Sequence, residues 1–279
     1  MEGRASRSYS PRASAGCRLT TGHGDEALPP AIASRQRPRR SPSRAVDVDA
    51  AIPILHAVTN DEIVGRRDFL DVARAVMRAM GARGALQLRA PRLAQDEPAR
   101  FVELALTLVE EQERCGTWLV INDRVDVALI VCARGVQLTA RSLHVGDALQ
   151  VIMTGSNQCG TGASTAIGAS VHSLEEGIAA RLAGATWAVV SDVLATHDTA
   201  TELPAARRSG DESGPALLER LVKYSGIPIV AIGGIVPQHV APLRRLGVHG
   251  VAAIRGIWDV EHSERAVIDY LSAYDSGVG

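Results

Sequence analysis

Short runs of apolar residues alternate with longer segments of helical spacing along most of this chain. Such short, continuous runs are typical of strands that are buried in a sheet. The predicted strands cover residues 52–58, 85–89, 118–121, 135–138, 166–170, 187–190, 228–232 and 250–254. Between most of them apolar side chains recur every three or four residues, as at Phe69, Val72, Val76 and Met80. The alternation predicts a repeated strand–helix unit.

Three stretches depart from this alternation. Residues 139–154 show no clear pattern after the fourth strand. Residues 155–163 are rich in glycine, serine and threonine, and residues 191–214 are mostly polar, so we expect both to be loops.

Eight strand–helix units in about 225 residues match a (β/α)8 TIM barrel, an α/β fold in which parallel strands close into a ring. Continuously apolar strands suit this sheet, because both of its faces are buried. An open, doubly wound sheet is the alternative, but it would usually carry a glycine-rich turn after its first strand. Here residues 59–62 follow the first strand, and no glycine occurs before Gly65. The pattern therefore favours the barrel.

The first 48 residues differ in composition from the rest of the chain. They are rich in serine, arginine, proline and glycine, and their few apolar residues follow no period. Such a segment cannot bury enough apolar surface to offset the entropy lost on ordering. We expect a disordered extension at residues 1–48 and a barrel domain at residues 49–279. A transit peptide or a basic nucleic-acid arm are the alternatives for the extension, and its lack of an apolar core argues against a secretory signal.

Charge and cysteine content narrow the expected partners. The formal net charge is -1, but nine arginines stand before residue 45, which leaves 21 basic and 28 acidic residues in the rest of the chain. An acidic body argues against nucleic-acid binding, and no apolar run approaches the ~18 residues that cross a membrane. The 4 cysteines form no C-x-x-C pair, so we expect reduced thiols in the cytoplasm and neither a zinc nor a redox site. The sequence leaves the oligomeric state open, a homo-oligomer included.

Glycines follow the last two predicted strands, where barrels of this kind commonly bind phosphate. Gly233 and Gly234 come directly after the seventh strand, and Ile254 and Arg255 stand where the eighth strand ends. Without side chains, the two glycines let a phosphate oxygen approach backbone N–H groups closely. Arg255 adds a planar, charged donor. We therefore predict a phosphate site at Gly233, Gly234, Ile254 and Arg255.

Six segments lie in order, each at the end of a different predicted strand: residues 55–59 (LHAVT), 87–89 (QLR), 121–124 (INDR), 135–138 (GVQL), 170–173 (SVHS) and 231–235 (AIGGI). Together they resemble the thiamine-phosphate synthase and TenI superfamily. Their shared order makes the resemblance specific, and it extends over nearly all of residues 54–260. It implies a barrel that binds a small phosphorylated thiazole.

Two activities occur in this superfamily. Synthases join a pyrimidine pyrophosphate to a thiazole phosphate and use Mg²⁺, whereas TenI-like tautomerases aromatise a thiazole phosphate carboxylate and need no cofactor. The synthase pattern has a lysine two residues after Arg89, where this chain has Pro91, and a second Mg²⁺-binding aspartate where it has Ser142. It also has a lysine after the sixth strand, and the single lysine here, Lys223, lies elsewhere. Pyrophosphate departure needs compensating positive charge, so these differences favour the tautomerase.

The resemblance also implies roles for the residues that match the superfamily. Arg89, Asn122, Gln137 and Ser170 are expected to contact the substrate, and Arg89 would pair bidentately with a carboxylate. Asp123 would bind Mg²⁺ only in a synthase. A single carboxylate is a poor Mg²⁺ site unless substrate oxygens complete the octahedron.

Proton transfer in a tautomerase requires a group whose pKa lies near the working pH. TenI-like enzymes carry a catalytic histidine just after the sixth strand, and Asp192 holds that position here. An aspartate is a weak base at neutral pH unless burial raises its pKa, so His172 and His197 are further candidates. Each has a simpler competing role: a loop cap for Asp192, a helix N-terminal position for His172 and a solvated loop for His197.

Three functions therefore compete on the sequence. A TenI-like thiazole tautomerase is favoured. The alternatives are a thiamine-phosphate synthase with a reduced magnesium site and a non-catalytic protein that binds or senses thiazole phosphate. A Schiff-base aldolase is disfavoured, because its nucleophile must be a lysine at the barrel mouth, and Lys223 precedes the seventh strand.

Overall fold

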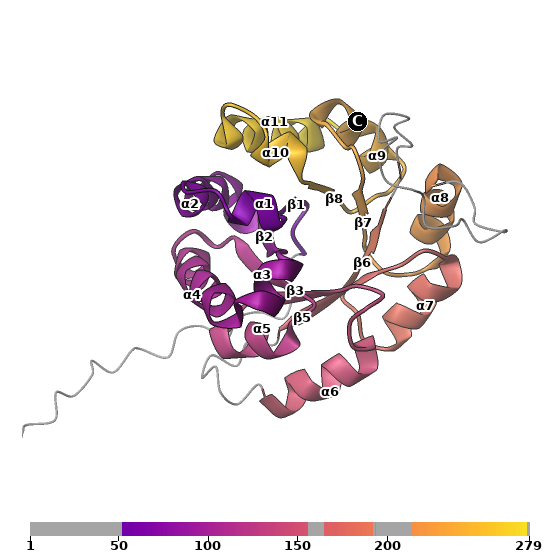
Figure 1. The fold of residues 1–279 in the computed structure, drawn as a ribbon. Coiled ribbons are helices and arrows are strands. Elements are labelled where there is room, and N and C mark those ends of the chain that lie inside the picture. The colour runs from indigo at the N-terminus through magenta and orange to yellow at the C-terminus, as the bar shows by residue number, and fades with distance from the viewer. Residues whose placement is uncertain (1–51, 156–164, 192, 194–213, 278–279) are drawn as a thin grey trace, which may run out of the picture. The chain divides into compact units, whose positions relative to one another are not determined.

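Eight parallel strands close into a barrel in the computed structural model of this chain (Figure 1). The structure describes residues 52–155, 165–191, 193 and 214–277. The strands are β1 (Leu55–Val58), β2 (Gly84–Leu88), β3 (Trp118–Asn122), β4 (Gly135–Leu138), β5 (Ala166–Ser170), β6 (Trp187–Val190), β7 (Ile229–Ile232) and β8 (Gly250–Ala253). Each strand pairs with the next one in the chain, and β1 closes the ring by pairing with β8. The predicted (β/α)8 fold is confirmed.

Helices surround the ring of strands (Figure 1). They are α1 (Asp61–Val64), α2 (Phe69–Met80), α3 (Pro91–Asp96), α4 (Pro98–Cys115), α5 (Val125–Val131), α6 (Val145–Gly155), α7 (Leu174–Leu182), α8 (Gly214–Tyr224), α9 (Pro237–Arg245), α10 (Arg255–Trp258) and α11 (Ser263–Asp275), with a 3-10 turn at Gly81–Arg83. The expected extension at residues 1–48 and most of the two expected loops lie outside the described residues, so they stay predictions. None of the described helices has the length and apolar character needed to span a bilayer.

Two elements depart from the expectation by more than one residue at an end, each for a local reason. The first strand begins at Leu55 and not at residue 52, because Pro53 has no N–H to donate to a neighbouring strand. Helix α6 occupies part of the stretch that shows no clear pattern. Its fully buried side chains are only Ala148 and Ile152, so its apolar stripe is too narrow for sequence periodicity to reveal.

Two indole rings fill much of the barrel interior. Trp118 and Trp187 meet edge to face, with ring centroids 6.4 Å apart. Gly135 and Gly168 leave the room for them: a Cβ on Gly135 would lie 3.1 Å from the Trp187 ring, and a Cβ on Gly168 only 2.2 Å from it. His56 also packs against Trp187, and burial lowers the pKa of this histidine to about 4. Large and small residues therefore interdigitate inside the ring, as packed barrels require.

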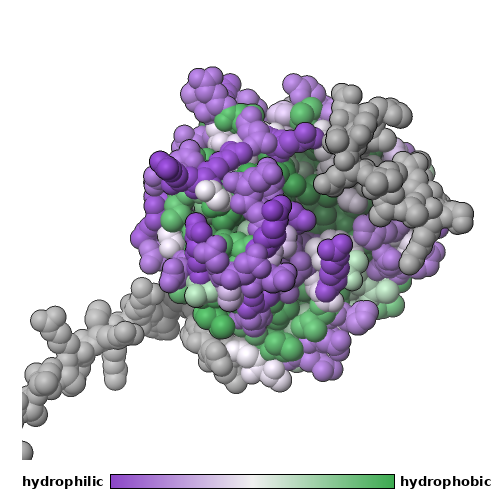
Figure 2. All heavy atoms as spheres, in the orientation of Figure 1, coloured by the Kyte–Doolittle hydropathy of each residue, from purple (hydrophilic) through white to green (hydrophobic). Residues whose placement is uncertain are grey.

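A second apolar layer lies between the strands and the helices and joins residues from nearly every element. In Figure 2, hydrophilic residues dominate the helices on the visible face, and hydrophobic residues show through toward the centre. Because all strands are parallel, their carboxyl ends meet at one end of the barrel, and the loops that follow them gather there. That end carries every predicted site residue that the structure describes.

Candidate functional site

The loops after β7 and β8 share one cavity. It measures about 520 Å³ and is lined by Ile232, Gly233, Gly234, Ile235, Val236, Ala252, Ala253, Ile254, Arg255 and Gly256. The two strands are direct neighbours, with Ile232 opposite Ala252. The structure thus brings all four residues of the predicted phosphate site to a single cavity. Its size suits a small phosphorylated ligand.

The backbone after β7 adopts a conformation that favours glycine. Gly233 has φ 119° and Gly234 has φ 63°, and side-chain-bearing residues rarely adopt such positive angles. Arg255 opens α10 with an exposed side chain, and no described residue forms an ion pair with it. The cavity therefore combines glycine backbone with one unpaired cation, a composition that suits an anionic ligand.

A chain of hydrogen bonds runs across the carboxyl ends of β2 and β3. The Gln87 side-chain amide donates to Asn122 Oδ1 at 2.6 Å, and Asn122 Nδ2 donates to Asp123 Oδ2 at 2.6 Å. Asp123 has φ 62°, a conformation that costs energy for a residue other than glycine. These contacts fix the carboxylate at the end of β3.

The other carboxylate oxygen of Asp123 is held from the loop after β4. Oδ1 accepts hydrogen bonds from the Thr139 N–H at 3.0 Å, from Thr139 Oγ1 at 2.8 Å and from Ser142 Oγ. Ser142 is the residue that stands where the synthase pattern has its second Mg²⁺-binding aspartate. In this chain a hydroxyl donor therefore contacts Asp123 directly.

These contacts limit what Asp123 can offer a magnesium ion. Three donors saturate Oδ1, whereas among the described residues Oδ2 accepts a hydrogen bond from Asn122 alone and keeps one lone pair. Among the described residues, no group of three or more His, Cys, Asp or Glu side chains could hold a metal. Mg²⁺ commonly binds one or two carboxylates together with substrate phosphates and water. The described residues therefore fit an ion that would receive one carboxylate ligand from Asp123 and its other ligands from substrate oxygens and water.

A second cavity lies next to Asp123. It measures about 250 Å³ and is lined by Ala90, Pro91, Ala94, Gln95, Phe101, Asn122, Asp123 and Arg124. Arg124 is engaged elsewhere, because its guanidinium pairs with Asp126 at 2.6 Å and this contact raises the pKa of Arg124. Asn122 and Asp123, at the end of β3, are the polar groups that the cavity offers besides Arg124 and Gln95, and no lysine lines it.

Gln137 and Ser170 form a separate network under the mouth. Gln137 is 2% exposed; its carbonyl oxygen accepts from Trp187 Nε1 at 2.9 Å, and its amide nitrogen donates to Ser170 Oγ at 3.2 Å. Half-buried Ser170 is the outermost member of this network. The structure supports contact with a ligand more readily for Ser170 than for the fully engaged Gln137.

Arg89 follows β2 and is anchored through its backbone. Its N–H donates to Thr59 Oγ1 at 2.9 Å, and Thr59 Oγ1 donates to the Arg89 carbonyl at 3.0 Å. The side chain is half-buried, and among the described residues no partner engages its guanidinium. Arg89 thus stands as an unpaired cation at the mouth, as its predicted substrate-binding role requires.

Only one of the three proton-transfer candidates can be located. His172 is exposed between β5 and α7, and its backbone N–H donates to Glu176 Oε2 at 2.7 Å. Ser173 caps α7 by accepting a hydrogen bond from the Glu176 N–H at 3.1 Å. His172 therefore directly precedes the N-cap residue of this helix. Asp192 and His197 lie outside the described residues. All three catalytic assignments stay predictions.

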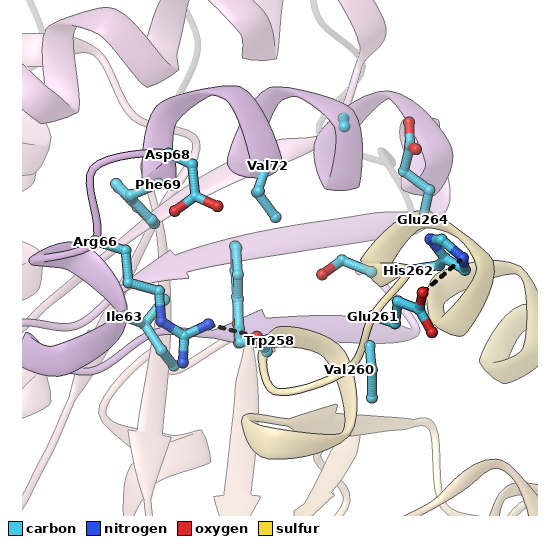
Figure 3. A pocket seen from close by; sticks show the side chains of 12 residues that line it. Ile63, Arg66, Asp68, Phe69, Val72, Trp258, Val260, Glu261, His262 and Glu264 are labelled. Carbon is cyan, nitrogen blue, oxygen red and sulfur yellow. Dashed lines mark hydrogen bonds and ion pairs between the residues drawn. The ribbon is translucent and has the colours of Figure 1, made fainter.

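A third cavity, of about 240 Å³, lies between α2 and the segment that follows α10 (Figure 3). Figure 3 shows Arg66 reaching Trp258, whose carbonyl accepts from Arg66 Nη1 at 2.5 Å. Arg66 also pairs with Asp259. These contacts tie α10 to the turn after α1.

Three residues that sequence reasoning did not select prove relevant to the site. Gln87 and Thr139 hold Asn122 and Asp123 in place, and Tyr270 from α11 donates to the Ile235 carbonyl at 2.6 Å. Gln87 left a signal, because it is a polar residue within an apolar strand. Tyr270 gives no such signal, because its position in the sequence fits the helical spacing of any buried residue on α11.

This geometry defines a (β/α)8 barrel with a glycine-lined cavity after its last two strands. A structure described as thiamine phosphate pyrophosphorylase from Pyrococcus furiosus has a similar fold, with a TM-score of 0.62 and 25% sequence identity over 81% of this chain and 97% of that one.

Sequence comparison gives the family. Residues 55–257 match the family described as thiamine monophosphate synthase. A thiamine-phosphate synthase of Methanoculleus marisnigri is 33% identical over 225 residues, which cover 77% of this chain and 94% of that protein. A bifunctional thiamine biosynthesis protein, ThiM/ThiE, of Symbiobacterium thermophilum is 36% identical over 202 residues, 71% of this chain and 38% of that protein. The chain belongs to the thiamine-phosphate synthase and TenI superfamily, as the six segments predict.

Proposed function

We propose that this chain is a thiamine-phosphate synthase that joins a phosphorylated thiazole to a hydroxymethylpyrimidine pyrophosphate. The observation that carries the proposal is the pair of cavities at the carboxyl end of the barrel, one lined by the glycine loops and one by Asn122 and Asp123. The names of the relatives support the same reaction. This reverses the preference drawn from the sequence, in which the tautomerase came first.

The reaction forms one bond and breaks one. A nitrogen of the thiazole ring attacks the methylene carbon of the pyrimidine, and the pyrophosphate leaves with the electron pair of the C–O bond. Gly233, Gly234, Ile254 and Arg255 would hold the thiazole phosphate. Holding both substrates in line removes much of the entropic barrier to a bimolecular reaction.

The other cavity would receive the pyrophosphate. Arg89 supplies positive charge at the end of β2, and Asn122 supplies amide hydrogen bonds. Among the described residues, Asp123 Oδ2 would be the one carboxylate ligand to Mg²⁺, and a bound ion would neutralise charge on the departing pyrophosphate. The chain's own task is to keep that carboxylate in place: Asn122 donates a hydrogen bond to Oδ2, and Thr139 and Ser142 donate to Oδ1.

A thiazole tautomerase is the second candidate. It is favoured by the hydrogen bond from Ser142 to Asp123, which occupies the place of a second metal-binding carboxylate. Pro91 in place of a lysine supports it as well. In that reaction Arg89 would pair with the substrate carboxylate, and Asp192, His172 or His197 would move the proton.

Two assays on the full chain separate these functions. The first measures pyrophosphate release from the pyrimidine pyrophosphate and thiazole phosphate, with and without Mg²⁺. The second follows aromatisation of the thiazole phosphate carboxylate by absorbance without Mg²⁺, with Asp192→Ala alongside. A synthase gives Mg²⁺-dependent release in the first assay. Aromatisation without release would overturn the proposal in favour of the tautomerase, and binding without turnover in either assay would indicate a thiazole-phosphate-binding protein.

A further inference from the structure

Tyr270 touches both loops of the glycine-lined cavity from outside the barrel. It belongs to α11 and is 1% exposed. Its hydroxyl donates to the carbonyl of Ile235 at 2.6 Å, one residue after Gly234. Burial raises the pKa of Tyr270 to about 12, so the hydroxyl keeps its proton over the whole physiological range.

The same hydroxyl leaves no room for a side chain at Gly256, in the segment that follows β8. A Cβ built on Gly256 would lie 2.2 Å from Tyr270 Oη and 3.6 Å from the Ile235 carbonyl oxygen. Gly256 therefore packs against the hydroxyl at a distance that no side chain allows. One oxygen atom thus lies between the loop after β7 and the first turn of α10, and both line the cavity.

We propose that Tyr270 is a positioning residue that sets the spacing of the two anion-binding loops. The proposal rests on the phosphate site of the proposed function. A phosphate in this cavity must receive donors from both loops at once, and such sites lose affinity steeply when their donors move by about 1 Å. Tyr270 does not touch the ligand in this arrangement; it acts through Ile235 and Gly256.

Tyr274 offers a matched control on the same helix. One turn after Tyr270, its hydroxyl donates to the carbonyl of His249 at 2.9 Å, directly before β8 and thus at the opposite end of the barrel. Its ring also lies beneath the Arg244 guanidinium, 4.1 Å from the ring centroid. Both tyrosines bond a backbone carbonyl, but only Tyr270 reaches the cavity loops.

The test compares Tyr270→Phe with Tyr274→Phe in the full chain by calorimetric titration. The ligands are hydroxyethylthiazole phosphate, hydroxyethylthiazole without phosphate, and inorganic phosphate. We expect Tyr270→Phe to weaken both phosphate-containing ligands about tenfold, as loss of one well-placed hydrogen bond can. The unphosphorylated thiazole should bind within twofold of wild type. Tyr274→Phe should leave all three affinities within twofold.

A steric variant tests the same contact from the other side. Gly256→Ala should weaken phosphate binding on its own, and Tyr270→Phe added to it should recover part of the loss. Removing the hydroxyl leaves Tyr270 Cζ as the nearest tyrosine atom, at 3.3 Å from the new methyl group.

The outcomes separate this inference from the proposed function. Equal losses in Tyr270→Phe and Tyr274→Phe, or equal losses for phosphorylated and unphosphorylated thiazole, would show that Tyr270 is merely structural. An additive double variant would contradict the steric contact. A wild-type chain that binds no phosphate-containing ligand would overturn the phosphate site and this inference together.

Discussion

The two cavities at the mouth of the barrel are built from different parts of the chain. The cavity between β7 and β8 owes its form mainly to backbone, with two consecutive glycines at positive φ. The cavity near β3 depends on side chains, above all Asn122 and Asp123. A backbone site persists as long as its glycines do, whereas a side-chain site changes with each substitution.

The positions where this chain departs from the superfamily pattern differ between the two cavities. The glycine loops keep the pattern of the superfamily, whereas two departures from it, Pro91 and Ser142, lie at or next to the other cavity; the departures after the sixth strand lie outside the described residues. Both reactions of the superfamily start from a thiazole phosphate, and only the synthase also needs a pyrophosphate site. Under the proposed function, the retained half would serve the shared substrate, and the altered half would decide which reaction the chain performs.

The largest expected effect comes from the glycine half. Gly234→Val should weaken hydroxyethylthiazole phosphate about 100-fold, because a β-branched residue at φ 63° is strained and blocks close approach of the phosphate. Calorimetric titration measures the affinity. Gly226→Val is the control, since Gly226 has φ 67° in the turn before β7, at the other end of the barrel. If both variants lose affinity equally, global strain and not the site would be responsible.

A smaller effect is expected at Arg89. Arg89→Ala should weaken the pyrimidine pyrophosphate about 30-fold, because a charged, unpaired donor is lost, and should leave thiazole phosphate within threefold. Steady-state kinetics with each substrate varied in turn measures this, with Arg89→Lys to test the planar geometry. Selective loss of a carboxylated thiazole phosphate would instead assign Arg89 to the tautomerase reaction.

The smallest expected effect concerns Ser142. Ser142→Asp adds a second carboxylate beside Asp123, so the Mg²⁺ concentration needed for half-maximal pyrophosphate release should fall about tenfold. Ser142→Ala removes the hydrogen bond without adding a ligand, and its Mg²⁺ requirement should not fall. An unchanged requirement in Ser142→Asp would mean that position 142 does not face the ion.

The sequence predicts the barrel well because its evidence is local. Each strand is a short, mainly apolar run, and burial on both faces favours that pattern at all eight positions. Helix α6 escapes the same reasoning because it buries so few side chains, and Pro53 trims the first strand. The phosphate site at the glycines after β7 could also be predicted, because that prediction needed only their position directly after the seventh strand.

The rest of the site depends on contacts between distant residues. Sequence reasoning could align Ser142 with a lost aspartate, but not show that its hydroxyl bonds Asp123, 19 residues away. The bond from Tyr270 to Ile235 spans 35 residues and leaves no periodic signal. Such pairings arise only when the ring closes and brings neighbouring loops together.

The tryptophans of this chain have a practical consequence. The chain holds 3 of them, and all are buried: Trp118 and Trp187 within the ring and Trp258 at the end of α10. The Trp187 indole is linked through Gln137 to Ser170 at the mouth, while Trp258 shares α10 with Arg255. We therefore expect intrinsic fluorescence to respond to ligands that bind near Ser170 or near Arg255, so that titrations can be followed without attaching a dye.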